Sequence, residues 1–415
     1  MSDAPDGSTV VPDIPYVRQG EGERRATFFE LFFDLVYVFA VTQLSHHLLE
    51  HLTWGGALET LFLLIAVYWA WNYTTWMANW FDPEVPAVRL VLAFVMLASL
   101  LMAVAIPEAF GDHALLFVAS YCALQVARNA FVVAVTPTGA FHRNFQQILG
   151  WSLLSGPLWV AGALAEGGPR WGWWLGALGL DLAGPLVRYW LPGMGRTPIA
   201  EWAIDPGHFA ERFQLFVIIV LGESIVVTGA TATDAGLDVA VVAGLCLAFV
   251  TSVALWWLYF GDIAGVAVRR IAHDELPGKT GRDAYTYLHL PIVAGMLLTA
   301  VGDELVLAHP GDPLGTAGAL VALGGPAVYL LGLVGFGARV GRPQPWTRLV
   351  GVVALVAAIP VATHVDALVT TGFTAVLLPM VVALESGRAP GGGDPGSARA
   401  PGGSVRSRRW SWRGS

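Results

Sequence analysis

Residues 237–260 read LDVAVVAGLCLAFVTSVALWWLYF, an apolar run in which Asp238 is the one charged side chain. A transmembrane helix needs about 20 apolar residues to cross a hydrocarbon core of roughly 30 Å, so this run is long enough to span a membrane. A strand of a membrane barrel would instead alternate apolar and polar residues over about ten positions, and this run does not alternate. The stretch therefore predicts a transmembrane α-helix.

Similar apolar runs recur along the whole chain. We predict twelve spans, at residues 29–49, 56–78, 87–107, 113–135, 145–165, 171–191, 209–230, 237–260, 284–307, 315–337, 347–363 and 366–384. The last two are short and are separated by a tight connection around His364, so ten or eleven full spans remain possible. The predicted fold class is all-α: a polytopic integral membrane bundle of about twelve transmembrane helices.

The composition agrees with lipid as the main solvent. Hydrophobic residues make up 55% of the chain and charged residues only 13%, about half the charged share that is usual in a soluble domain. A formal net charge of -8 argues against a nucleic-acid partner, which would require a basic surface. Cys122 and Cys246 lie inside apolar runs, so we predict neither a disulfide nor a metal site there, and no cofactor.

The positions of Lys and Arg predict the orientation of the spans. Basic residues stay on the cytoplasmic side of a membrane during insertion. With the N-terminus inside and twelve spans, 22 of the 23 Lys and Arg residues fall on inner segments, and only Arg170 falls on an outer loop. We therefore expect a multi-pass protein of the bacterial cytoplasmic (inner) membrane with both termini in the cytoplasm.

Two tails flank the spans. Residues 1–27 lack the apolar centre of a secretory signal, so we expect a disordered cytoplasmic tail and no cleaved leader. Residues 386–415 are rich in Gly, Pro, Ser and Arg and are also predicted to be disordered. The end of this second tail could either contact anionic lipid headgroups or remain solvated, and the candidate lipid-binding residues are Arg406, Arg408, Arg409, Trp410, Trp412 and Arg413.

A faint internal repeat divides the chain at an offset of about 180 residues. It predicts a first six-helix repeat at residues 28–192, a cytoplasmic linker at 193–208 and a second repeat at 209–385. The aligned positions are Glu30 with Glu211, then Trp76, Trp80 and Asp82 with Trp256, Phe260 and Asp262, and finally residues 106–108 with residues 302–304. Because six spans preserve orientation, the two repeats would be parallel.

Ionisable residues inside the spans are the candidates for a transport pathway, because a charge at membrane depth is costly unless it faces a partner or water. Asp34 follows Glu30 by one helical turn, so the two carboxylates share a face. Glu211 opens the first helix of the second half, and Arg212 lies about three turns before Glu223 on the same face.

Three further charges lie in the first half: Arg128 in the fourth span, Asp181 near the middle of the sixth, and Arg188 two turns beyond it. In one interpretation these charges pair across helices and only stabilise the bundle. In the other, Asp34, Asp181 and Glu223 line a path and exchange a proton or a cation. Glu223 favours the second interpretation, because Gly222, Ser224 and Thr228 surround it with small and polar residues.

Other chemistries have little support. His47 and His51 have the i, i+4 spacing of a metal pair, but no companion motif accompanies these weak candidates, so we predict no metal site. The loops are too short for a soluble catalytic domain, and they contain no phosphate-binding glycine loop and no HExxH motif. We therefore predict that the protein is not an enzyme.

Two motifs resemble the bacterial low temperature requirement A family. The first is Phe29-Glu30-Leu31-Phe32-Phe33-Asp34-Leu35-Val36 with Thr42-Gln43-Leu44, and the second runs from Glu211-Arg212-Phe213 to Leu221-Gly222-Glu223-Ser224. The resemblance covers about residues 24–385 and implies a multi-pass bacterial membrane protein associated with growth in the cold. It implies no catalytic residues.

The leading functional hypothesis is a secondary transporter or ion channel for a small ion or solute, with its pathway between the two halves. The alternative is a non-transporting membrane scaffold or sensor that supports growth in the cold. A membrane-embedded enzyme acting on lipid-linked substrates, with a polar cavity near the histidines or near Asp303 and Glu304, is a less favoured third hypothesis.

Overall fold

The computed structural model describes residues 16–18, 25–261, 263–342 and 346–386. Within these ranges the secondary structure is helical, apart from three isolated β-bridges. The helices of the first half are α1 (Phe28–Glu50), α2 (Trp54–Trp80), α3 (Pro86–Val104), η1 (Ile106–Glu108), α4 (Ala114–Val135), α5 (Ala140–Leu164) and α6 (Gly167–Leu186). A connection containing η2 (Ile199–Glu201) leads to the second half.

The second half contains two helices that are interrupted near the end of the bundle where α1 begins. Its elements are α7 (Pro206–Ala235), α8 (Val239–Phe260), α9 (Ile263–Ala272), α10 (Pro277–Thr280), η3 (Gly281–Tyr287), α11 (His289–Ala308), α12 (Gly315–Arg339), α13 (Trp346–Ala362) and α14 (Ala367–Ser386). The segment η3 is a π-helix, in which each turn is wider than in an α-helix. The connection between the predicted spans 237–260 and 284–307 is therefore largely helical.

Each predicted span coincides with a helix, so the all-α membrane bundle is confirmed. Ten helical segments of the described chain are long and apolar enough to cross a membrane, by length and composition. Of the twelve predicted spans, α6 and α13 fall outside this group. The helix α13 has only 17 residues, and α6 carries the charged side chains of Arg170 and Asp181.

The helices are hydrophobic on nearly all sides, as expected for a protein whose exterior faces lipid. Large apolar side chains such as Leu90, Phe249 and Val353 are exposed on the outside of the bundle. The interior contains tightly packed aromatic side chains, including Trp69, Trp71 and Trp159. This arrangement separates an apolar outer surface from an interior where polar groups can be held.

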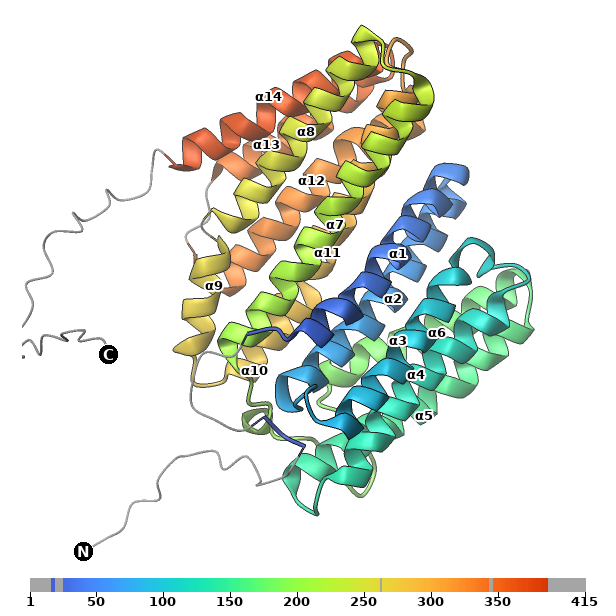
Figure 1. Cartoon of the computed structure of the whole chain (residues 1–415), viewed down its shortest axis with the longest axis vertical. Coiled ribbons are helices and arrows are strands. Elements are labelled where there is room, and N and C mark those ends of the chain that lie inside the picture. The colour runs from blue at the N-terminus through green and yellow to red at the C-terminus, as the bar shows by residue number, and fades with distance from the viewer. Residues whose placement is uncertain (1–15, 19–24, 262, 343–345, 387–415) are drawn as a thin grey trace, which may run out of the picture.

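The chain forms two helical groups that lie side by side (Figure 1). In both groups the first helix packs against the second and the third, and the following helices pack against their neighbours in the chain. The groups meet where α1 and α2 contact α7 and α11. The helices α1 and α7 run in the same direction, because Asp34 contacts Arg212 and Thr42 contacts Glu223. The parallel repeat stays a prediction, and these matching contacts support it.

The start of α1 is held by two local contacts. The Thr27 hydroxyl accepts a hydrogen bond from the Glu30 amide, and the Glu30 carboxylate accepts one from the Thr27 amide, which forms a capping box. Before the helix, the backbone of residues 16–18 pairs with the end of α2 around Phe81. Part of the N-terminal segment predicted to be disordered is therefore ordered, whereas residues 387–415 lie outside the described residues, together with the candidate lipid-binding residues.

The turn between α9 and α10 has a purely local role. The Thr280 hydroxyl donates to Asp274, and this hydrogen bond, with a second from the Leu276 amide, holds the pKa of the Asp274 carboxyl below its usual range. This pairing is a turn contact within one loop.

Candidate functional site

An ion pair buried between the two halves connects α1 to α7. The guanidinium of Arg212 donates to both oxygens of Asp34, with each nitrogen to oxygen distance at 2.7 Å. The Trp71 indole N–H donates to the same carboxylate at 2.9 Å. Asp34 is only 2% exposed and Arg212 only 1% exposed. The charge of Asp34 is therefore neutralised by a partner in bidentate geometry, the strongest arrangement for such a pair.

A second carboxylate of α1 extends this network toward the end of the bundle where α1 begins. One oxygen of Glu30 lies 2.8 Å from the His208 ring, and the other accepts a hydrogen bond from Arg18 at 2.8 Å. Glu211 lies nearby and accepts a hydrogen bond from the Ala26 amide at 2.9 Å. We call Arg18, Glu30, Asp34, His208 and Arg212 the ionic network. Both carboxylates have oppositely charged partners, and only the Arg212 Nε is buried without a hydrogen-bond partner among the described residues. This pairing fits the interpretation of these charges as structural contacts between the halves.

The charges of the first half are also satisfied, by a chain of neutral groups. Arg128 donates to Gln125, Gln125 donates to the Tyr121 hydroxyl at 3.1 Å, and Tyr121 donates to Asp181 at 2.8 Å. The Trp159 indole also donates to Asp181, at 2.9 Å. We call Arg128, Gln125, Tyr121 and Asp181 the relay. It connects opposite charges without direct contact, and it crosses from α4 to α6.

Arg188 does not belong to the relay. The helix α6 ends at Leu186, and Arg188 follows in a left-handed turn with a φ of 58°. Its backbone carbonyl accepts a hydrogen bond from the Thr197 amide, which fixes the turn after the helix. The predicted sixth span, residues 171–191, therefore extends past the end of α6, and Arg188 lies in the turn after the helix rather than two helical turns beyond Asp181.

Glu223 has the most incomplete set of partners of the predicted pathway carboxylates. One carboxylate oxygen accepts a hydrogen bond from the Thr42 hydroxyl at 2.6 Å, and the other is buried and has no partner among the described residues. The residue as a whole is 1% exposed. Arg212 shares its helix, but its guanidinium is turned to Asp34 rather than to Glu223.

Two further carboxylates of α11 lie in the same region. Asp303 accepts a hydrogen bond from the Ser224 hydroxyl at 2.9 Å and is 5% exposed. Glu304 is close enough to Glu223 for the two charges to repel each other, and one of its buried oxygens has no partner within the described chain. We call Glu223, Asp303 and Glu304 the carboxylate cluster. In the parts of the chain that the structure describes, no Arg or Lys side chain forms an ion pair with any of them.

Hydroxyl groups and one histidine complete the surroundings of the carboxylate cluster. The Ser252 hydroxyl lies 3.1 Å from the Ser224 hydroxyl. His46 follows Thr42 by one turn of α1, is exposed, and lies within electrostatic range of Glu223 and Glu304. Oxygen ligands with negative charge are the groups that bind a proton or an alkali cation, so this arrangement can exchange either one.

The histidines at the end of α1 contact each other and a glutamate of α2. The rings of His47 and His51 lie against each other, with centroids 4.7 Å apart, and His47 Nε2 lies 3.5 Å from Glu59. No group of three or more metal-binding side chains is present in the described ranges. His47 and His51 thus form a ring contact.

Several residues of these networks were not singled out as site residues by the sequence. His208 lies outside the predicted spans, and Gln125 and Tyr121 are uncharged, so a search for charges in spans misses them. Asp303 and Glu304 entered only the repeat alignment and the less favoured enzyme hypothesis, not the list of pathway candidates. The signal in the sequence was that two acidic residues lie together near the outer end of a span. That signal does not reveal that α11 packs on α7, which brings these residues close to Glu223.

The fold and these buried polar networks define a polytopic α-helical membrane protein. A family model described as bacterial low temperature requirement A protein matches residues 25–383. The protein therefore belongs to this family. An uncharacterized protein of Rhizobium meliloti (strain 1021) is 38% identical over 372 residues, which cover 89% of this chain and 90% of the relative. No solved structure matches the chain.

Proposed function

We propose that the protein is a transport protein of the bacterial inner membrane in which the carboxylate cluster carries a proton or a monovalent cation. One observation carries this proposal: Glu223 is buried in α7 with one carboxylate oxygen unpaired, and no Arg or Lys side chain of the described chain forms an ion pair with it. A buried carboxylate without a counter-ion is expensive unless it binds a proton or a cation.

The contrast with the other carboxylates supports the choice of site. Asp34 is paired with Arg212, and one oxygen of Asp181 accepts two hydrogen bonds, from the Tyr121 hydroxyl and the Trp159 indole. Both therefore serve the structure of the bundle in this proposal, and neither serves as a coupling group. The exposed His46 would connect the carboxylate cluster to the end of the bundle where α1 ends.

The orientation is part of the same proposal. Both termini would be cytoplasmic, because this orientation places 22 of the 23 Lys and Arg residues on the inner side. The carboxylate cluster would then open toward the periplasm. Transport through the membrane interior, rather than catalysis of a reaction, is the activity we propose.

Ion flux in proteoliposomes tests the proposal. Purified protein is reconstituted into liposomes that contain dyes sensitive to pH, Na⁺ or K⁺, and gradients of protons, Na⁺ and K⁺ are imposed in turn. We expect a flux above that of empty liposomes, and we expect Glu223→Gln to abolish it because the amide can hold neither a proton nor a cation. Glu166→Gln is the matched control, since Glu166 is exposed in a loop and its side chain caps no helix.

Two results would contradict the proposal. An unchanged flux in Glu223→Gln would exclude the carboxylate cluster as the coupling site. Absence of flux in the wild-type protein under every gradient would favour the non-transporting scaffold or sensor.

A further inference from the structure

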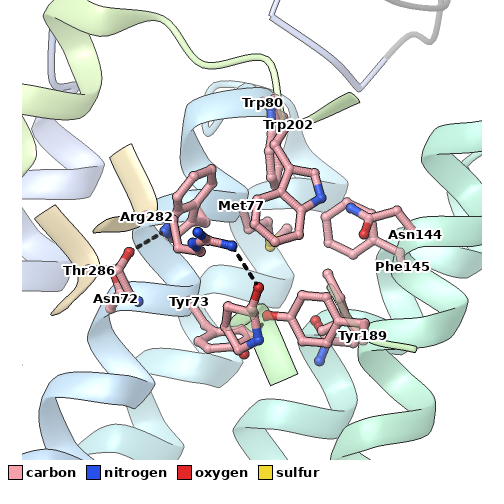
Figure 2. A pocket seen from close by; sticks show the side chains of 14 residues that line it. Asn72, Tyr73, Met77, Trp80, Asn144, Phe145, Tyr189, Trp202, Arg282 and Thr286 are labelled. Atoms are coloured by element: carbon pink, nitrogen blue, oxygen red, sulfur yellow. Dashed lines mark hydrogen bonds between the residues drawn. The ribbon is translucent and has the colours of Figure 1, made fainter. Parts of the chain in front are cut away.

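A pocket separate from the carboxylate cluster lies between the two halves, at the end of the bundle where α1 begins. Its volume is about 40 Å³, which is space for roughly three water molecules. Its walls are largely aromatic and include Trp76 and Trp80 of α2, Phe145 of α5, Tyr189 and Trp202 (Figure 2). Because aromatic rings form several of its walls, the pocket suits a planar chemical group.

Three buried polar atoms that belong to the pocket lining have no hydrogen-bond partner among the described residues. They are the Asn72 side-chain nitrogen, the Trp202 indole nitrogen and the Asn144 side-chain oxygen. These residues are 1%, 5% and 2% exposed, respectively. Nearly all buried polar groups in proteins are hydrogen-bonded, so three unpaired atoms around one pocket indicate that a bound molecule supplies the partners.

The orientation of the Asn72 amide follows from its neighbours. The Trp76 indole can only donate, and it donates to the Thr286 hydroxyl at 2.9 Å. The Thr286 hydroxyl in turn donates to the Asn72 oxygen, 3.2 Å away. This chain of donors places the Asn72 oxygen toward Thr286 and leaves the Asn72 N–H group available as a donor. The Trp202 indole is a second donor, and the Asn144 oxygen is an acceptor.

The positively charged side chain at the pocket, Arg282, already has partners within the protein. Arg282 forms an ion pair with Asp283 at 2.6 Å and donates to the Pro185 carbonyl at 3.1 Å. Figure 2 shows this second contact beside the pocket. An anionic ligand would therefore have to compete with Asp283 for the guanidinium, which favours an uncharged ligand.

The backbone around Arg282 and Thr286 is unusual. Both residues belong to η3, the π-helix of residues Gly281–Tyr287. Turns of π-helix are rare and are frequently found at functional sites. The wide turn places both side chains at the pocket, which supports a site built for a ligand.

We propose that this pocket binds a small uncharged solute through a carboxamide group. The carbonyl oxygen of such a group accepts a hydrogen bond from the Trp202 indole, while its N–H donates to the Asn144 oxygen, which lies beside Trp202 (Figure 2). The flat amide lies among the aromatic walls. This binding does not depend on the proposed transport activity, because it involves none of the residues of the carboxylate cluster.

Equilibrium binding to the full-length protein in lipid nanodiscs tests the proposal. Saturation-transfer NMR titrations use three small probes: acetamide, acetate of the same size, and N,N-dimethylacetamide, which is larger by two methyl groups. We expect acetamide to bind with a dissociation constant of about 1 mM, as suits so small a ligand, and we expect both other probes to bind at least roughly tenfold more weakly because one is charged and one lacks the N–H donor.

Two variants locate the binding. Trp202→Phe removes the indole donor but keeps an aromatic ring, and we expect it to weaken acetamide binding roughly five- to tenfold. Trp190→Phe is the matched control, because Trp190 is 50% exposed and does not line the pocket, and we expect wild-type binding. The proposal is overturned if the wild-type protein does not bind acetamide, if acetate or N,N-dimethylacetamide binds equally well, or if Trp202→Phe binds acetamide like the wild type.

Discussion

Asp34 and Glu223 are both carboxylates buried between α1 and α7, but their partners differ. Asp34 receives two hydrogen bonds from Arg212 and one from Trp71. Glu223 receives one, from Thr42. Removing one partner of a buried ion pair leaves an uncompensated charge, whereas neutralising an unpaired carboxylate removes a charge that has no partner. The same change in charge should therefore have opposite effects on stability at the two positions.

We predict that Asp34→Ala lowers the free energy of unfolding by about 3 to 5 kcal/mol, because Arg212 would remain buried without its counter-ion. Unfolding of the purified protein in mixed micelles by increasing denaturing detergent provides the measurement. The double variant Asp34→Leu with Arg212→Met should recover much of this loss. If Asp34→Ala costs no more than Glu223→Gln, the distinction between the two carboxylates is wrong.

The relay leads to a second prediction at the level of single residues. The Tyr121 hydroxyl joins Gln125 to Asp181, so Tyr121→Phe should leave two buried polar groups each short of a partner. We expect a loss of about 1 to 3 kcal/mol in the free energy of unfolding. The same detergent titration measures it, with Tyr16→Phe as the control because the Tyr16 hydroxyl belongs to neither the relay nor the ionic network. A loss no greater than in the control would contradict the relay.

Charges at membrane depth identified Glu30, Asp34, Arg128, Asp181 and Glu223 as special from the sequence alone. Their partners were harder to predict, because pairing depends on which helices touch. Asp34 faces Arg212, 178 positions away along the chain, and nothing local to either residue specifies that contact. The place of Arg188 was mispredicted for a different reason. The apolar run continues past the end of α6, so hydropathy did not mark the left-handed turn in which Arg188 lies.

The helix pair α11 and α12 packs with unusually close backbones. A side-chain carbon added at Gly295 would lie 2.4 Å from the Tyr329 backbone nitrogen, and one added at Gly325 would lie 2.6 Å from the Thr299 backbone nitrogen. Gly302 and Gly332 make equally close approaches, each seven residues from its neighbour on the same helix. Small residues at such intervals let two membrane helices approach closely and gain van der Waals contact.

We predict that Gly325→Ala destabilises the protein by about 1 to 3 kcal/mol, because the methyl group would meet helix backbone that can move only if α11 and α12 separate. Gly324→Ala is a closely matched control, since a side-chain carbon there meets nothing within 4 Å. Detergent titration of both variants checks the prediction. Equal stability of the two variants would show that the close approach is not required.

Element positions followed well from hydropathy, because each span must be long and apolar whatever its neighbours are. The π-helix η3 and the break between α8 and α9 were not predicted. Residues 281–287 contain Arg282 and Asp283 beside apolar residues, and their wide turn depends on packing against α2 and the connection before α7. Sequence periodicity carries no signal for such a tertiary cause.

At the level of the whole molecule, the packing of α1 beside α7 connects the two halves. Thr42 and Glu223 are in contact and are 181 positions apart, which is close to the offset of the predicted repeat. Glu30 and Glu211 are separated by the same distance in sequence. Equivalent helices that run in parallel and touch at equivalent heights are what an axis along the membrane normal would produce.

The sequence did not decide whether the last hairpin, α13 and α14, crosses the membrane fully. The connection between these two helices gives a reason to expect two full crossings. The Ala367 amide donates to the Asp312 carbonyl and the Leu368 amide donates to the Pro310 carbonyl. The turn around His364 therefore lies at the same end of the bundle as the connection between α11 and α12. A hairpin that entered the membrane only partway would leave its turn away from that connection.

Thiol labelling in cells tests this topology. In a background with Cys122→Ser and Cys246→Ser, single cysteines are placed as His364→Cys and as His309→Cys, the second in the connection after α11, where His309 is exposed. A membrane-impermeant maleimide added from outside should label both, because both positions are on the periplasmic side in the proposed orientation. Arg196→Cys, in the predicted cytoplasmic linker, should be labelled only after the membrane is permeabilised. Labelling of His309→Cys without His364→Cys would mean that the hairpin does not cross, and labelling of Arg196→Cys in intact cells would reverse the orientation derived from the basic residues.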